Sequence, residues 1–85
     1  MSTFAECWDT AALSTRVTVS DGMPQPSNMD GLPWRLWRSH NFTGTLVAKS
    51  DGVPRSMKFE LVPVNGATVS YEIVEGLGHV FTIET

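Results

Sequence analysis

The chain has 85 residues, of which 41% are hydrophobic and 18% charged, and its nine acidic and six basic side chains give a net charge of −3. This length predicts one domain, and the composition is globular rather than disordered. The acidic balance disfavours the phosphate attraction behind non-specific nucleic-acid binding. A single cysteine excludes an intrachain disulfide, so stability must come from packing, self-association or a partner.

Residues 1–14 are predicted to form a short helix. Thr3, with Glu6 three residues later, has the spacing of a capping box, which satisfies two backbone amides at a helix start. The apolar residues at helical spacing, which would cover a sheet, are Phe4, Cys7, Trp8, Ala11 and Ala12.

Residues 15–20 change to an alternation of period two. Val17 and Val19 alternate with polar residues, and Asp21-Gly22 follows as a turn signal. This pattern predicts a short edge strand, whose edge Arg16 would help to protect from other chains.

Residues 21–41 are predicted to form a loop rich in proline and tryptophan. Its three prolines fix the backbone and remove hydrogen-bond donors. A connection of this length inside a small domain is often functional or mobile. Within it, residues 34–38 fit either a single helical turn beginning near Pro33 or a strand, and the sequence does not decide between them.

Residues 42–85 are predicted to form a four-stranded antiparallel meander, from Phe42 to Glu84. Directly paired residues must share one face of a sheet, which tests each candidate turn. A two-residue turn at Asp51-Gly52 passes this test for the first hairpin. It predicts the pairs Leu46–Met57, Gly44–Phe59 and Phe42–Leu61.

The same test excludes a two-residue turn at Asn65-Gly66, because core residues would then face polar ones. A three-residue loop, Val64-Asn65-Gly66, instead predicts the pairs Leu61–Val69, Phe59–Tyr71 and Met57–Ile73. A short loop around Glu75-Gly76-Leu77 predicts Tyr71 opposite Phe81 and Val69 opposite Ile83. The core face of this meander would carry Phe42, Leu46, Ala48, Met57, Phe59, Leu61, Val69, Tyr71, Ile73, Phe81 and Ile83.

The fold class is therefore α+β: the meander, a short N-terminal helix and an edge strand. Closure with Val17–Val19 into a small barrel is the competing architecture.

The sequence contains no convincing catalytic or metal-binding pattern. Cys7 with His40 or His79 is the one thiol–imidazole combination, but Cys7 lies in the apolar helical stripe and is expected to pack as a small hydrophobic residue. His79 is expected to be partly buried with a hydrogen bond to the backbone. No His/Cys pair has zinc-ligand spacing, so we expect no catalytic residue, metal or cofactor.

The segment that stands out is Trp34 to His40, with two of the three tryptophans and two of the six basic residues. Tryptophan and arginine dominate interface hot spots. The alternative is that both tryptophans cover the core. The predicted partner-binding residues are Trp34, Arg35, Trp37, Arg38 and His40.

The sequence favours a small non-enzymatic protein-binding module, an inhibitor or adaptor of a kind that phages also encode, with a protein partner of unknown identity. Met23, Met29 and Leu32 would add adaptable apolar contacts. The alternatives are single-stranded nucleic-acid binding, with Trp34 and Trp37 as stacking platforms, or a structural subunit of a homo-oligomer or viral particle. The absence of a secretory signal and of a membrane-length apolar run predicts a cytoplasmic, reducing location, or the host cytoplasm for a viral protein.

Overall fold

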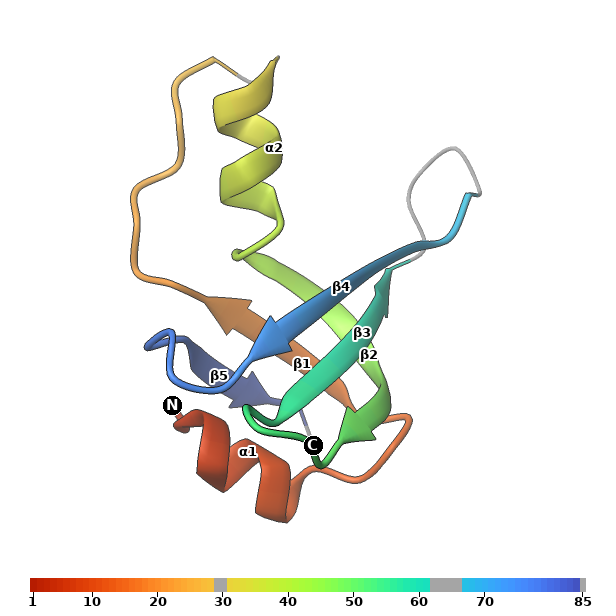
Figure 1. The fold of residues 1–85 in the computed structure, drawn as a ribbon. Helices are drawn as coiled ribbons and strands as arrows, with labels where there is room; N and C mark the ends of the chain where they lie inside the picture. Colours follow the sequence, from red (N-terminus) through yellow and green to blue (C-terminus); the bar gives the residue numbers. More distant parts are fainter. Residues whose placement is uncertain (29–30, 62–66, 85) are drawn as a thin grey trace.

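The computed structural model describes residues 1–28, 31–61 and 67–84. These residues form an antiparallel sheet and two short helices, so the predicted α+β class is confirmed (Figure 1). The elements are α1 (Phe4–Thr10), β1 (Arg16–Ser20), α2 (Leu32–Arg38), β2 (Phe42–Ser50), β3 (Ser56–Leu61), β4 (Val69–Val74) and β5 (Val80–Ile83).

The sheet has the strand order β4-β3-β2-β1-β5 and every neighbouring pair is antiparallel. β1 therefore lies inside the sheet, and the prediction of an edge strand is wrong. Val17 and Val19 face the core and are buried, while Arg16 forms an exposed ion pair with Glu84 at 3.3 Å. β4 and β5 are the two ends of the described sheet, which is not closed into a barrel.

β5 pairs with β1, so the predicted hairpin between β4 and β5 is also wrong. The observed partners are Val19 with Phe81 and Val17 with Ile83. After β4 the chain crosses the end of the sheet through Gly76 and Gly78, whose positive φ angles of 97° and 79° favour glycine. This crossing places Phe81 opposite Val19 of β1 instead of beside Tyr71.

The first hairpin has a longer turn and a different register from those predicted. Residues 51–55 connect β2 to β3, and Leu46 pairs with Phe59. The register shifts between Leu46 and Ala48, which is a β-bulge. One extra residue reverses the alternation of side chains between the two faces of the strand. Ala48 is therefore exposed, and the prediction that it belongs to the core is wrong. Lys49 now pairs with Met57, and its Nζ donates to the Trp8 carbonyl at the end of α1.

The pairing of β3 with β4 is as predicted. Leu61 faces Val69, Phe59 faces Tyr71 and Met57 faces Ile73. The loop Val64-Asn65-Gly66, on which that prediction depended, lies outside the described residues.

α1 begins with the predicted capping box. The Thr3 amide donates to Glu6 Oε1 at 3.0 Å, and the Glu6 amide donates to Thr3 Oγ1 at 3.3 Å. The helix ends at Thr10, earlier than the predicted 1–14 span, because Ala11 is already extended. Its inner side places Phe4 and Cys7 over the end of the sheet.

The core lies between α1 and one face of the curved sheet. Phe59 is at its centre: its ring lies 5.6 Å from that of Phe42 and 6.5 Å from that of Phe81, and Phe81 in turn meets Phe4. The buried apolar residues are Phe4, Cys7, Ala11, Val17, Val19, Phe42, Leu46, Met57, Phe59, Ile73 and Phe81. Trp8, Leu61, Tyr71 and Ile83 are half-buried against them.

The predicted loop 21–41 contains α2, so of the two alternatives for residues 34–38 the helical one is correct. Pro33 occupies the first turn of α2, where its missing amide hydrogen costs no intrahelical bond. Along the described parts of the chain, neither helix has the length and apolar character needed to cross a membrane.

Candidate functional site

α2 stands away from the sheet and joins it only at its C-terminal end (Figure 1). None of its residues is buried, and neither Trp34 nor Trp37 belongs to the core cluster. The two indole rings instead stack on each other, with centroids 5.3 Å apart. Trp37 is further held by its Nε1, which donates to the Met23 carbonyl at 2.9 Å.

A groove of about 280 Å³ lies between α2 and the segment that precedes it. Most of its lining is apolar, and Leu36, Met23 and the more distant Leu32 are 57%, 62% and 64% exposed. The groove residues are Asp21, Met23, Pro24, Pro26, Leu36, Trp37 and His40. We refer to this groove together with Trp34, Arg35 and Arg38 as the α2 surface.

Arg35 and Arg38 outnumber Asp21, the acidic residue of the groove, and therefore give the α2 surface a net positive charge. Neither guanidinium forms an ion pair with a described residue. Arg38 lines a second, more polar hollow with Arg16 and Glu60, over the face of the sheet opposite the core. The two arginines therefore lie at different borders of the groove.

Asn41 attaches the base of α2 to the end of β1. Its Nδ2 donates to Asp21 Oδ1 and to the Trp37 carbonyl, both at 2.9 Å. Its Oδ1 accepts from Ser20 Oγ at 3.0 Å and from the Asp21 amide at 3.4 Å. All four polar positions of one amide side chain are thus used, which fixes where the helix begins to rise from the sheet.

His40 attaches the same base to the connection between β4 and β5. Its Nδ1 lies 2.9 Å from Nε2 of His79, and the two rings are stacked with centroids 5.0 Å apart. His79 is 6% exposed, and its Nδ1 has no hydrogen-bond partner among the described residues. The predicted backbone hydrogen bond of His79 is therefore replaced by one to a second imidazole.

The surroundings of His79, where α2 joins the sheet, favour the neutral form of its imidazole. Burial, and secondarily the charge of His40, lower the pKa of His79, while Asp21 acts in the opposite direction. Desolvation opposes the charged form of Asp21 itself. The hydrogen bonds from the Met23 amide and Asn41 nevertheless keep the pKa of Asp21 below its ordinary value.

The lowered pKa of His79 predicts an acid-sensitive fold. Below the unfolded-state pKa of about 6.5 the unfolded chain binds a proton that the folded chain resists. The stability present above that value should be lost, by at most about 1.4 kcal/mol per pH unit, as the pH falls toward the folded-state pKa. Urea unfolding followed by tryptophan fluorescence between pH 8 and 5 measures this loss. His79→Leu should flatten the profile, and an unchanged profile in that variant would contradict the assignment.

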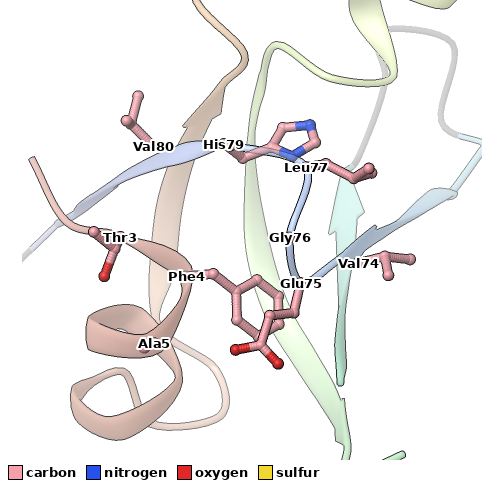
Figure 2. Close-up of a pocket in the computed structure, with 10 residues that line it drawn as sticks. Thr3, Phe4, Ala5, Val74, Glu75, Gly76, Leu77, His79 and Val80 are labelled. Atoms are coloured by element: carbon pink, nitrogen blue, oxygen red, sulfur yellow. The ribbon is translucent and has the colours of Figure 1, made fainter. Parts of the chain in front are cut away.

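A cavity of about 370 Å³ lies between the start of α1 and residues 74–80 (Figure 2). Figure 2 shows Phe4 and Ala5 on α1, and Glu75, Leu77 and His79 on the connection between β4 and β5. Glu75 is already held by Arg55, at 3.0 and 2.6 Å. Because its acidic group is occupied, this cavity offers a ligand little beyond apolar contact.

The chemistry available elsewhere is limited. No group of three or more His, Cys, Asp or Glu residues in the described ranges could hold a metal ion. Cys7 is completely buried, and burial raises the pKa of its thiol despite the nearby charge of Lys49.

The structure brings Trp34, Arg35, Trp37 and Arg38 together on α2. His40 lines the groove with Trp37, while its Nδ1 lies against Nε2 of His79. The sequence pattern did not single out Leu36 or the two prolines of the groove, nor Asn41 at its base. A signal for Leu36 was present, since it lies between Trp34 and Trp37 in the segment whose composition stands out. Comparison with protein-family models, curated proteins and solved structures found no match to this chain.

Proposed function

We propose that this protein is a non-enzymatic binding module, an inhibitor or adaptor, that takes an apolar and acidic segment of another protein on its α2 surface. The observation that carries the proposal is a helix that buries none of its residues while presenting two tryptophans and two leucines.

Within the described part of the chain, the apolar side chains of the α2 surface do not pack on the hydrophobic core. A helix of seven residues is unstable by itself in water and normally depends on packing of an apolar face. Here α2 is held by its base instead, through Asn41 and Trp37. Exposed leucine and methionine beside indole rings are typical of surfaces that become buried in a complex.

The charge of the α2 surface indicates the chemistry of the partner. Arg35 and Arg38 border an apolar groove in a chain whose net charge is −3. Carboxylates beside the bound apolar side chains would pair with these guanidiniums in forked geometry. An acidic amphipathic segment therefore fits better than a basic one.

The test is quantitative affinity capture from the source cells with the intact chain and two variants. Leu36→Asp places a charge in the groove and should abolish capture of the specific partner. Leu77→Asp is the matched control, because Leu77 is 61% exposed but lies in the β4–β5 connection. A set of captured proteins that is the same for all three chains would refute the proposal.

The charge component is tested on the captured partner. Arg35→Glu should weaken binding at least about tenfold, because like charges placed opposite each other at an interface repel. Lys58→Glu, an exposed change on β3, serves as the control. Titration of the tryptophan fluorescence with oligothymidylate examines the nucleic-acid alternative. Saturable binding that weakens steeply with salt would refute the protein-partner proposal in favour of single-stranded nucleic-acid binding.

A further inference from the structure

The two ends of the sheet differ in how their backbone is used. At β5, Ser2 forms a bridge with Phe81: the Ser2 amide donates to the Phe81 carbonyl at 2.6 Å and the Phe81 amide donates back at 2.8 Å. At β4, the side away from β3 pairs with no other strand of residues 1–28, 31–61 or 67–84. Among the described strands, β4 is therefore the edge strand to which no further bridge is joined, and its outer side presents a row of backbone groups for pairing.

β4 also lacks the features that usually protect a sheet edge. Its sequence, Val69 to Val74, contains no proline, no lysine and no arginine, and Glu72 is its only charged residue. It has six residues in regular register with β3 and no bulge. A regular edge of this length is a template for another strand.

We propose that a second copy of this chain occupies the β4 edge, in an antiparallel pair centred on Tyr71. In this register Ser70 lies opposite Glu72 of the second copy, and Val69 opposite Ile73 of the second copy. Each pair joins residues of the same face, since the core-facing positions of β4 are those opposite Leu61, Phe59 and Met57. The strand is thus complementary to itself.

Charge selects this register over its neighbour. Centring the pair on Glu72 would place that carboxylate directly opposite its own copy, and like charges directly opposite are destabilising. Centring on Tyr71 places each Glu72 beside a serine hydroxyl instead. Tyr71 is half-buried against Phe42, at 5.1 Å between ring centroids, so it is already oriented toward the core at the proposed axis.

The β4 edge shares no residue with the α2 surface, so the pairing is independent of the proposed partner binding. Two copies joined at β4 would each keep one α2 surface. The dimer would therefore offer a partner two equivalent sites.

Cysteine crosslinking tests the register. Ser70→Cys and Glu72→Cys both change exposed side chains. Under mild oxidation, an equimolar mixture of the two variants should form a covalent heterodimer, because directly opposite positions come within disulfide reach. Neither variant alone should crosslink efficiently, and the native chain, whose Cys7 is buried, is the control. Efficient self-crosslinking of Glu72→Cys would overturn the register.

Light scattering over a range of concentrations tests the pairing itself. The apparent mass should rise with concentration from 9.3 kDa toward twice that value. Ser70→Glu introduces two repulsive pairs across the axis and should raise the dimer dissociation constant about fivefold, whereas Ser70→Lys should lower it. A monomer mass at millimolar concentration would overturn the proposal, as would equal effects of the two Ser70 variants.

Discussion

Replacing Phe59 with alanine should lower the free energy of unfolding by about 3–5 kcal/mol. The ring is completely buried and lies between those of Phe42 and Phe81, so its removal leaves a cavity that joins both halves of the core. Small domains have total stabilities of about 5–15 kcal/mol. The variant should therefore be largely unfolded at modest urea concentrations, as circular dichroism would show.

Trp34→Ala is the matched comparison, an aromatic residue that is not in the core. Its ring stacks on Trp37 and is half-exposed, so its loss should cost about 1 kcal/mol. If Trp34→Ala destabilised the fold as much as Phe59→Ala, α2 would have to pack on the core in solution. That result would remove the main support for a binding role of the α2 surface.

Asn41→Ala should have the second-largest effect, about 2–4 kcal/mol, since it deletes a side chain with four hydrogen bonds, each worth about 0.5–1.5 kcal/mol. Besides the lower free energy of unfolding of the whole domain, we expect α2 in particular to open more often. Hydrogen exchange of the α2 amides should accelerate more than that of β2, because Asn41 joins the Trp37 carbonyl to the end of β1.

Ser39→Ala is the control for Asn41→Ala, because Ser39 makes one exposed hydrogen bond to the Leu36 carbonyl. It should change stability by less than about 0.5 kcal/mol. Uniform acceleration of exchange throughout the sheet in Asn41→Ala would mean that α2 and the sheet unfold as one unit. The helix would then not be a separately held element.

The features that could be predicted from the sequence are those determined by neighbours along the chain. Thr3 and Glu6 define the start of α1 because a capping box needs only three residues of spacing. The β3–β4 register followed from the rule that Phe59 and Tyr71 must share a face. In both cases only one arrangement satisfied the local constraint.

The position of β5 in the sheet could not be predicted, because its alternation of apolar and polar residues fits pairing with either β4 or β1. Phe81 keeps its face whether it lies opposite Tyr71 or opposite Val19. Which pairing forms depends on Phe4 and Phe59, which meet Phe81 only in the folded chain. In the first hairpin, Asp51-Gly52 indicated a tight turn, but the bulge near Ala48 accommodates a longer one.

The candidate site could be predicted only in part, because the sequence shows which residues are neighbours along the chain but not their distant contacts. Trp34 to Arg38 are consecutive, so their unusual composition is visible in the sequence. The contacts that position these residues are not visible in the sequence. Asn41 contacts Ser20, and His40 contacts His79, each far away along the chain. Neither asparagine nor histidine carries a sequence signal that identifies such a partner.

The pairing of β1 with β5 also has a consequence for how the chain folds. The second strand partner of β1 is β5, which follows β2, β3 and β4 in the chain, so one edge of β1 stays open until these three strands have been synthesised. Such non-local pairing slows folding, because loop-closure entropy is lost before the contacts form. Until β5 pairs, the backbone amides and carbonyls on that edge of β1 remain available to other chains.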